Sequence, residues 1–448
     1  MTMQPRPADA RALLTDLYWA AVAAAAPGPA LSSALAAHPP DPRKAVHIIA
    51  LGKAAEPMAA SAVQVLKLGG REPAGGLLVV PEPSPSPHPA LSVAVGDHPQ
   101  PGAGSLASAA ALATAVTAVR PQDEVWVLLS GGTTSLIGAP VEGLRSADLT
   151  ELYRLLLGSG LDIAAMNRIR KRFARWAGGR LAVALAPAHV KNFTISDVIG
   201  DDLGSIGSGP CVPDSCYAAE VRTALTSAGL WEQLPQSLRE HLDAVQRGKA
   251  SETPKPDNPA FHTTETILVA SNRLALEAAC TRARAFGLEA LLLDSALAGE
   301  AALTGRQLAQ RLLDYDATNV AGAQVGGMNK NAVLVWGGET TVTLSPDAGL
   351  GGRSQELALS AAQILGRAGR PVTLLAAGTD GRDGPTDAAG GFADSGTWTA
   401  IRDAGRDPER DLSTHHGYDA LTAGGAIFKT GMTGTNVMDL VLGYVPRA

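Results

Sequence analysis

The sequence predicts an α/β protein of two domains, and three observations carry this prediction. Short apolar runs typical of buried strands alternate with longer segments of helical periodicity along the chain. The chain has 448 residues, of which 46% are hydrophobic, and this length suggests two domains. A polar, proline-rich segment at 248–260 is typical of a linker. We therefore predict domains over residues 1–250 and 261–448.

The composition excludes several classes of protein. The net charge is −6 and the pI about 5.9, so no surface for nucleic acid is expected. Cysteine occurs only three times, which gives no disulfide framework. The apolar stretch Leu17–Ala26 follows Asp9 and Asp16, and we interpret it as a first helix. No run reaches the length of a membrane span, so we expect a cytoplasmic protein without a membrane partner.

In the first domain, short apolar runs predict the strands, and each run ends at a glycine or a polar loop. Strands are predicted over Val46–Leu51, Gly76–Val80, Leu91–Val95, Glu124–Leu129 and Lys191–Ile195. Helical patterns follow these runs up to about residues 68, 119, 186 and 248. Ligands of open α/β sheets bind beyond the carboxyl ends of such strands.

Lys53 follows the first strand directly after Gly52, at the mouth of a strand–glycine–helix junction. A cation there can neutralise a transferring phosphoryl group. The alternative is a surface lysine, although a cation at a helix start opposes the helix dipole. The loop from Ser130 to Ser135 is rich in hydroxyls and glycines and can bind an anion, although a tight turn is comparably common.

Three further groups in the first domain carry charge. Asp97 and His98 form an oriented acid–base pair or an ordinary turn. Arg170 lies in a basic run that is either a solvated face or a contact for an anionic substrate. Asp197 and Asp201 crowd one loop with a third carboxylate, which favours a metal or catalytic role there.

The second domain repeats the alternation. Strands are predicted over Thr266–Ala270, Glu289–Leu293, Val333–Trp336 and Val372–Ala377, helices over 273–286 and 299–313, and a loop over 319–331. Gly349, Gly351 and Gly352 open onto Arg353 and a helix, an arrangement that favours an anion. Glu339, Asp380 and Asp383 follow apolar runs, where acidic residues can hold a cation that bridges phosphates. Taken singly, each is also an ordinary turn residue.

The standard nucleotide motifs are missing from the sequence. There is no GxxxxGK[ST] loop, and one GxGxxA match occurs at Gly102, Gly104 and Ala107. That match does not follow a strand directly, and Asp123, at the expected distance, begins a strand rather than ending one. We interpret the match as accidental, which argues against a dehydrogenase.

Eight motifs in order resemble the class II glycerate kinases, or glycerate 2-kinases, some of which carry a provisional name of hydroxypyruvate reductase. They are GKAAEPM (52–58), GDHPQP (96–101), SGGTTSL (130–136), SDVIGDDLGSIGSGP (196–210), GGETTVTL (337–344), GGRSQELAL (351–359), GTDGRDGPTDAAG (378–390) and TGMTGTNVMDL (430–440). The resemblance covers nearly the whole chain.

The resemblance implies ATP- and Mg2+-dependent phosphorylation of D-glycerate at its 2-hydroxyl. It implies a Rossmann-like N-terminal domain, a smaller α/β C-terminal domain and an active-site cleft between them. Lys53, Asp197 and Arg353 match motifs that imply catalytic roles, with Lys53 and Arg353 neutralising the γ-phosphoryl group. Asp197 would be the base or a metal ligand. A homodimer is expected on the general grounds that metabolic enzymes commonly form homo-oligomers.

Three further sets of binding residues follow from the same resemblance. Substrate or phosphate would be bound by Ser130, Gly131, Gly132, Ser135, Asp97, His98 and Arg170. The nucleotide would be bound by Gly351, Gly352, Gly378, Thr379, Thr433 and Asn436. Metal would be held by Asp201, Glu339, Asp380 and Asp383.

The chain departs from the family pattern at Ala174 and Ala177, where a serine and a lysine are usual, and at Ser354, where asparagine is usual. A related hydroxy acid is therefore an alternative substrate. The alternative activity is that of an NAD(P)H-dependent hydroxypyruvate reductase, but this sequence has no credible dinucleotide-binding fingerprint. A third hypothesis is a ligand-binding protein without catalytic activity. It predicts the loss of Lys53, Asp197 or Arg353, but all three residues are present.

Overall fold

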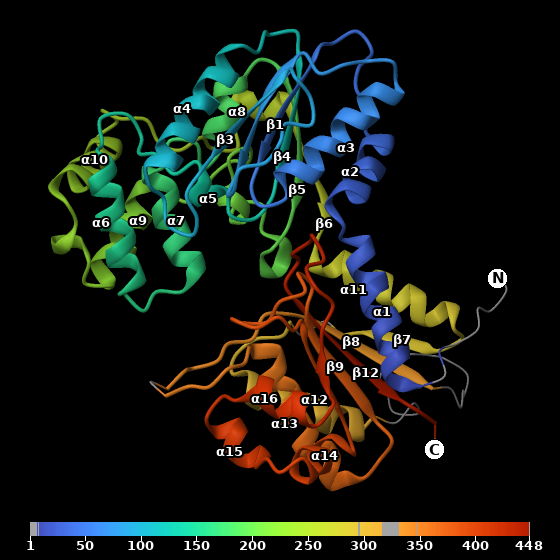
Figure 1. The fold of residues 1–448 in the computed structure, drawn as a ribbon. Helices are drawn as coiled ribbons and strands as arrows, with labels where there is room; N and C mark the ends of the chain where they lie inside the picture. Colours follow the sequence, from blue (N-terminus) through green and yellow to red (C-terminus); the bar gives the residue numbers. More distant parts are fainter. Residues whose placement is uncertain (1–6, 8, 294–295, 316–330, 346, 448) are drawn as a thin grey trace. The chain divides into compact units, whose positions relative to one another are not determined.

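The computed structural model describes residues 7, 9–293, 296–315, 331–345 and 347–447. The predicted loop over 319–331 lies outside the described residues apart from Asn331. The chain divides into two compact units (Figure 1). We call residues 27–269 the central unit, and residues 1–26 with 270–448 the discontinuous unit.

The central unit is built on a six-stranded sheet in the order β3-β2-β1-β4-β5-β6. Its strands are β1 (Val46–Leu51), β2 (Gly75–Val80), β3 (Leu91–Val95), β4 (Glu124–Leu129), β5 (His189–Ile195) and β6 (Thr264–Ala270). Strands β1 to β5 pair in parallel, and β1 and β4 are buried along their whole length. This explains their continuous apolar sequences, because a parallel sheet is covered on both faces.

The helices of the central unit fall into two groups. Those along the sheet are α2 (Pro27–Ala37), α3 (Ala55–Leu68), α4 (Ala103–Thr117), α5 (Thr133–Leu136) and α8 (Arg180–Leu185). A second group has a core of its own and comprises α6 (Ser146–Leu157), α7 (Ile163–Phe173), α9 (Ala218–Ser227) and α10 (Gln236–Gln246). Short 3-10 turns are η1 (Ile199–Asp201), η2 (Ile206–Ser208), η3 (Trp231–Gln233) and η4 (Pro259–Thr263).

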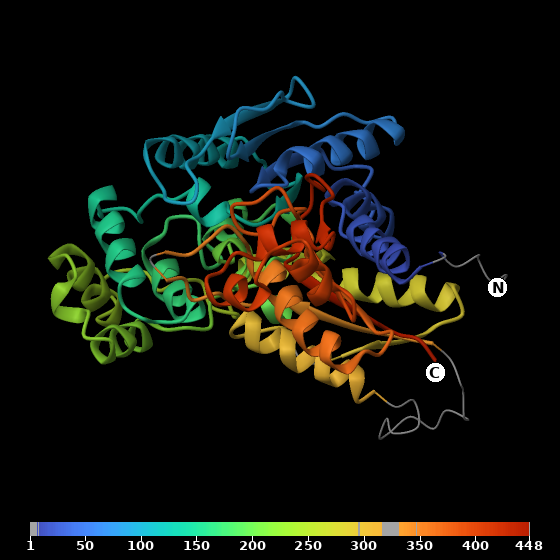
Figure 2. The same ribbon diagram turned by 60° about the horizontal axis from the view of Figure 1, so that its bottom comes forward.

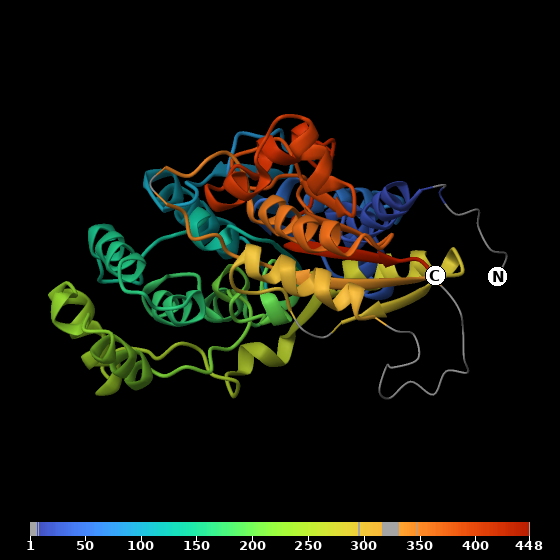
Figure 3. The same cartoon turned by 90° about the horizontal axis from the view of Figure 1, so that it is seen from below.

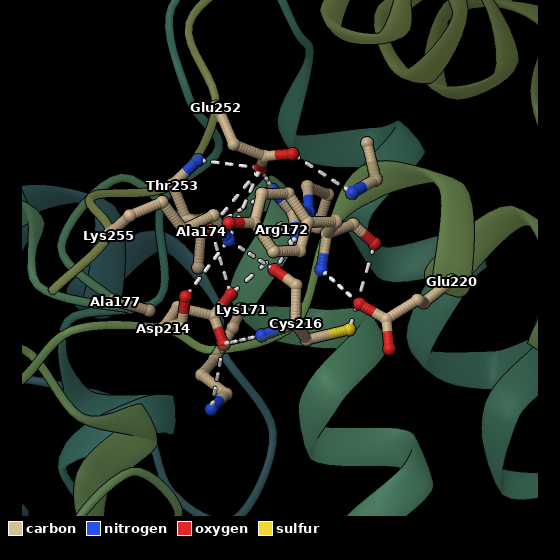
Figure 4. Close-up of polar contacts among 12 residues, drawn as sticks. Lys171, Arg172, Ala174, Ala177, Asp214, Cys216, Glu220, Glu252, Thr253 and Lys255 are labelled. Atoms are coloured by element: carbon tan, nitrogen blue, oxygen red, sulfur yellow. Dashed lines mark hydrogen bonds and ion pairs between the residues drawn. The ribbon is translucent and has the colours of Figure 1, made fainter.

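The segment predicted to be a linker is packed against α7 instead (Figure 4). Thr253 is 1% exposed, donates to Oδ2 of Asp214 over 2.9 Å and accepts from Nη1 of Arg172 over 3.0 Å. Glu252 forms an ion pair with the fully buried Arg172, and Lys255 donates to the carbonyl of Asp214 over 2.9 Å. A buried cation requires such partners, so the sequence here is polar because of Arg172 rather than because it is a flexible connection.

The discontinuous unit is built on a six-stranded sheet in the order β11-β10-β9-β12-β8-β7. Its strands are β7 (Glu289–Leu292), β8 (Ala332–Gly338), β9 (Thr373–Gly378), β10 (Gly390–Asp394), β11 (Ile427–Phe428) and β12 (Asp439–Val445). Strand β12 lies between β8 and β9 and is antiparallel to both. Only the pair β7–β8 is parallel among the described pairs of this sheet.

Helices cover both faces of this second sheet. They are α1 (Ala10–Ala24), α11 (Asn272–Ala285), α12 (Ala301–Leu313), α13 (Arg353–Ala368), α14 (Thr397–Asp403), α15 (Pro408–Ser413) and α16 (Gly417–Ala423). Gly337 faces α11, while Gly443 faces α12, and these strand positions alternate between the two faces. Figures 2 and 3 show α12 and α13 packed side by side.

The compact units differ from the predicted domains in two places. Helix α1, expected in the first domain, packs on α11 and belongs to the discontinuous unit. Strand β6, expected in the second domain, joins the sheet of the central unit. The prediction that an active site lies between the domains stays a prediction. Within the described residues no single helix is long and apolar enough to cross a membrane, and α1 with α2 reaches that length and composition only as a bent pair.

Candidate active site

In the central unit, the loops after β1, β4 and β5 meet at one edge of the sheet. These strands are parallel neighbours, so their carboxyl ends lie together. The amide of Lys53 donates to the carbonyl of Gly131 over 2.9 Å, and the amide of Ala54 donates to Oγ of Ser130 over 3.0 Å. Ser130 is therefore a buried support that joins the first two loops.

Two glycines bring Lys53, His98 and Asp197 together at this edge. A Cβ atom on Gly131 would lie 2.0 Å from Oδ2 of Asp197, so that carboxylate lies directly against the loop. Gly132 has a φ of +85°, and a Cβ there would lie 3.3 Å from the His98 ring and 3.4 Å from Cγ of Lys53. A side chain at either position would fill the space beside the three functional groups.

Burial and the charge of Lys53 shift the pKa values of Asp197 and His98 at this edge. Burial raises the pKa of the Asp197 carboxyl, while its own amide and the nearby Lys53 lower it in part. Burial and then the charge of Lys53 lower the pKa of His98, so its imidazole is neutral at neutral pH. The Lys53 side chain is exposed and has no ion-pair partner within the described part of the chain. The edge thus offers an unpaired cation beside a carboxylate.

The structure gives three of the predicted substrate residues a supporting position. Asp97 accepts the amide of Ser105 over 2.9 Å in the first turn of α4. Ser135 donates to the carbonyl of Pro99 over 2.6 Å and so holds the loop that carries His98. Arg170 stacks on the ring of Tyr153 at 4.7 Å, and burial lowers the pKa of Arg170.

In the discontinuous unit, a second group of charges meets at a sheet edge. Asp439, the first residue of β12, pairs with Gly338 at the end of β8 and with Gly378 at the end of β9. Because β12 is antiparallel to both neighbours, its start lies beside their ends. Glu339 directly follows β8, and Asp380 comes shortly after the end of β9. This register therefore brings Asp439 next to both carboxylates.

Arg353 is held by two of these carboxylates. Its Nε and Nη2 atoms donate to the two oxygens of Asp439 over 2.5 and 3.0 Å, and Nη1 lies 2.5 Å from Oε1 of Glu339. Burial lowers the pKa of Arg353, but the hydrogen bond and charge of Asp439 outweigh it and the pKa is raised. Asp439 lies within the motif TGMTGTNVMDL (430–440), but it was not predicted as a site residue because nothing local in the sequence indicates its contact with Arg353.

Asp383, predicted as a metal ligand, has another role in the structure. Its two oxygens accept the amides of Ser354 and Gln355 over 3.1 and 2.7 Å, at the N-terminus of α13. A Cβ on Gly352 would lie 2.3 Å from the Asp383 carboxyl carbon, which explains a glycine there. Gly351 lies next in the same loop. Burial raises the pKa of Asp383 to about 7, although both amides oppose this.

The predicted nucleotide residues after β9 form a loop braced by its own hydroxyls. Thr379 donates to the carbonyl of Met438 over 2.6 Å, and Thr433 donates to the carbonyl of Thr379 over 2.6 Å. Asn436 accepts the amide of Met438 over 3.1 Å. Gly378 stands where a Cβ would lie 2.7 Å from the carbonyl of Arg382. These contacts shape the backbone between β9 and β12.

The four predicted metal ligands do not form one cluster. Asp201 is in η1 of the central unit, and the other three are in the discontinuous unit. Among the residues that the structure describes, no group of three His, Cys, Asp or Glu could hold a metal ion. Glu339 uses Oε1 for Arg353, and Asp380 uses Oδ1 for the amide of Arg382 over 2.9 Å. The other oxygen of each carboxylate makes no hydrogen bond or ion pair with a described residue.

The glycine match at Gly102 and Gly104 has a structural explanation. A Cβ at these positions would lie 2.8 and 3.0 Å from Oδ2 of Asp97. These glycines therefore accommodate a carboxylate, which would repel a pyrophosphate. Asp123 lies at the other edge of the sheet, before β4. This geometry supports the interpretation of the match as accidental.

The departures at Ala174 and Ala177 lie beside the buried cluster of Figure 4. Both alanines are buried, and their carbonyls accept from Nη1 of Arg180 over 3.1 and 3.4 Å. Ser354 is also buried, at the start of α13. All three therefore contribute backbone contacts rather than polar side chains at an open surface.

Comparisons with known proteins agree with the fold and the motifs. Residues 13–243 match a domain of unknown function, DUF4147, and residues 332–439 match the MOFRL family. The glycerate 2-kinase of Pyrococcus horikoshii is 37% identical over 333 residues, which cover 73% of this chain and 71% of that protein. An Agrobacterium vitis protein with the provisional name hydroxypyruvate reductase is 37% identical over 96% of this chain and 94% of its own.

A solved structure extends the likeness to the whole chain. The crystal structure of glycerate kinase from Thermotoga maritima superposes with a TM-score of 0.85 at 32% identity, covering 97% of this chain and 99% of that one. A D-glycerate 2-kinase from the same organism is 37% identical in sequence to this chain, over 74% of each chain. The mixed α/β fold and the relatives together show that this chain belongs to the class II glycerate kinase (glycerate 2-kinase) family.

Proposed function

We propose that this protein transfers the γ-phosphoryl group of ATP to the 2-hydroxyl of D-glycerate, giving ADP and 2-phosphoglycerate. Family membership and the relatives named glycerate 2-kinase support this. The observation that carries the proposal is the unpaired Lys53 ammonium beside the Asp197 carboxylate and the Gly131–Gly132 loop. Phosphoryl transfer needs little beyond positioning, charge neutralisation and a proton acceptor, and this edge supplies the last two.

The proposed roles follow from the charges. Lys53 offsets the negative charge on the transferring phosphoryl group. Asp197 accepts the proton of the 2-hydroxyl as that oxygen bonds to phosphorus and ADP leaves. Its raised pKa makes it a stronger base than an ordinary aspartate, although a role as a metal ligand is the alternative. The neutral His98 can hydrogen-bond the substrate without adding charge.

Arg353 is proposed to bind phosphate of the nucleotide. Asp439 holds its guanidinium in one orientation, so the fork is preorganised before a phosphate arrives. Glu339 and Asp380 would hold Mg2+, which supplies charge neutralisation when bound with ATP. The cytoplasm is proposed as the compartment because all three cysteines are free thiols. A homodimer stays a prediction.

The test is a coupled ADP-release assay with D-glycerate, ATP and Mg2+, with the product identified as 2- or 3-phosphoglycerate. The proposal expects ADP release with 2-phosphoglycerate as the product. NADH oxidation with hydroxypyruvate, measured in parallel, addresses the reductase named for one relative. NADH oxidation without ADP release would overturn the proposal, and so would ADP release only with another hydroxy acid.

A further inference from the structure

In the discontinuous unit, one asparagine holds the chain on both sides of a residue with left-handed backbone. Met438, directly before Asp439, has a φ of +67°. This conformation is uncommon for residues other than glycine, and it persists where the surrounding contacts fix it. Asn272, the first residue of α11, is 7% exposed, and its Nδ2 atom donates to the carbonyl of Val437 over 2.7 Å and to that of Asp439 over 3.0 Å. A single amide group therefore bridges across Met438.

Other backbone groups of this segment are held as well. The amide of Val437 donates to Oγ1 of Thr379 over 2.9 Å, and the amide of Met438 donates to Oδ1 of Asn436 over 3.1 Å. The carbonyl of Met438 accepts from the amide and the hydroxyl of Thr379 over 3.0 and 2.6 Å. Thr379 and Asn436 belong to the loops that join the strands, whereas Asn272 ties the segment to a helix.

The position of Asn272 is itself fixed. Ser271, directly before it, is fully buried, and its Oγ atom accepts the amide of Leu274 over 3.3 Å at the start of α11. A Cβ atom on Gly337 would lie 1.9 Å from Oδ1 of Asn272, so the side-chain amide packs directly against β8. The asparagine thus spans β8 and β12 where Asp439 begins its strand.

We propose that Asn272 is a positioning residue for the reaction. It fixes the backbone of the buried Asp439, whose carboxylate oxygens both accept from the guanidinium of Arg353. A carboxylate orients its partner only where its own backbone is held, so Asn272 acts through Asp439 on Arg353. The inference rests on the proposed function, in which Arg353 binds a phosphate of the nucleotide. Loss of Asn272 should therefore weaken the use of ATP and leave that of D-glycerate nearly unchanged.

Steady-state kinetics test this split. In Asn272→Ala the KM for ATP should rise about tenfold, whereas kcat and the KM for D-glycerate should stay within about twofold. Asn192→Ala is the matched control, because Asn192 is also a buried asparagine, whose Nδ2 atom donates to Oγ1 of Thr266 over 3.3 Å in the central unit. It should lower Tm but leave the KM for ATP within about twofold of wild type. Equal KM values for ATP in the two variants would overturn the inference.

A double-mutant cycle separates positioning from general destabilisation. Arg353→Lys keeps the charge but has no planar guanidinium to orient. In that background Asn272→Ala should change the KM for ATP by less than about twofold, since its effect passes through the guanidinium. The same tenfold rise in both backgrounds would contradict the inference. Asn272→Ser keeps one donor, so its KM for ATP should lie between those of wild type and Asn272→Ala.

A measurement without substrate keeps the test independent of the proposed function. NMR of the full chain with 15N-labelled arginine reports the exchange of the Arg353 Nε proton with water, and Arg353→Lys identifies the signal. This exchange should be at least about tenfold faster in Asn272→Ala and unchanged in Asn192→Ala. Unchanged exchange in Asn272→Ala overturns the inference even if the wild type makes ADP. A wild type that releases no ADP overturns the proposed function, while faster exchange in Asn272→Ala still supports the positioning of Arg353.

Discussion

The candidate residues lie at two sheet edges, one in each compact unit, and the two edges hold their cations in opposite ways. In the central unit, the Lys53 ammonium is exposed and unpaired within the described chain. In the discontinuous unit, Arg353 is fixed by both oxygens of Asp439 and one oxygen of Glu339. A lysine on a flexible stem can follow a group that moves, whereas a clamped guanidinium presents one fixed geometry. This difference is the basis for proposing that the first edge meets the transferring group and the second a phosphate that stays in place.

The largest effect is expected when the positive charge of Lys53 is removed from the first edge. Lys53→Ala should lower kcat for ADP release by about 1,000-fold, because a preorganised positive charge is lost at the reacting group. Lys67→Ala is the matched control, since Lys67 is exposed in the last turn of α3 and should stay within about twofold of wild type. Equal activity of Lys53→Ala and Lys67→Ala would remove Lys53 from the mechanism.

The second effect is expected when the carboxylates that hold Arg353 at the other edge are changed. Asp439→Asn should lower kcat/KM by about 10- to 100-fold, because the guanidinium of Arg353 loses its fixed orientation. Glu339→Gln should cost less, since its side chain is 44% exposed while that of Asp439 is 6% exposed. Steady-state kinetics of both variants check this, with melting temperatures as the control for folding. A larger loss in Glu339→Gln would assign the positioning to Glu339 instead.

The third effect is a dependence of stability on pH at the second edge. Burial raises the pKa of Asp383 to about 7, whereas an unfolded aspartate has a pKa of about 3.9. Between these values the unfolded chain ionises first, so the free energy of unfolding should fall as pH rises, by up to about 1.4 kcal/mol per pH unit. Urea denaturation from pH 5 to 8, compared with Asp383→Asn, isolates this contribution. Parallel curves for the two proteins would contradict the raised pKa.

The smallest effect reports on the geometry of the first edge without any substrate. Burial and then the charge of Lys53 lower the pKa of His98. In Lys53→Met the imidazole pKa should rise but stay below its usual value, because only the second of these causes is removed. Titration of the His98 ring by NMR measures it, with His262 as an internal control. An unchanged pKa would mean that Lys53 does not face His98 in solution.

Much of the fold could be predicted because its signals are local. The apolar runs over Val46–Leu51, Leu91–Val95 and Glu124–Leu129 match β1, β3 and β4 residue for residue. Strands β1 and β4 are buried along their whole length, and such strands need continuous apolar sequence, which is easily found. Strand β10 (Gly390–Asp394) was missed because it begins with two glycines, and it forms through pairing with β9 rather than through propensity.

The candidate site could be predicted only in part. Lys53, Ser130 and Asp197 follow strands, so their sequence positions indicate a common edge. Asp439 could not be found in this way, because its role depends on β12 inserting between β8 and β9, a long-range pairing without a local signal. The packing of the segment around Thr253, predicted to be a linker, also has no local signal, because its partner Arg172 is distant in sequence.

The order of the chain has a consequence for synthesis on the ribosome. Helix α1 docks late, because its partners come after the whole central unit. Asp16 pairs with Arg282 over 2.6 Å, and Tyr18 donates to the carbonyl of Gly378 over 2.9 Å. Tyr18 and Gly378 are 360 residues apart, so at roughly 5–20 residues per second about 18 to 72 seconds separate their synthesis. During that time the side chains of Leu13, Leu14 and Leu17, which are buried in the folded protein, lack their native cover, and transiently exposed apolar surface of this kind favours aggregation.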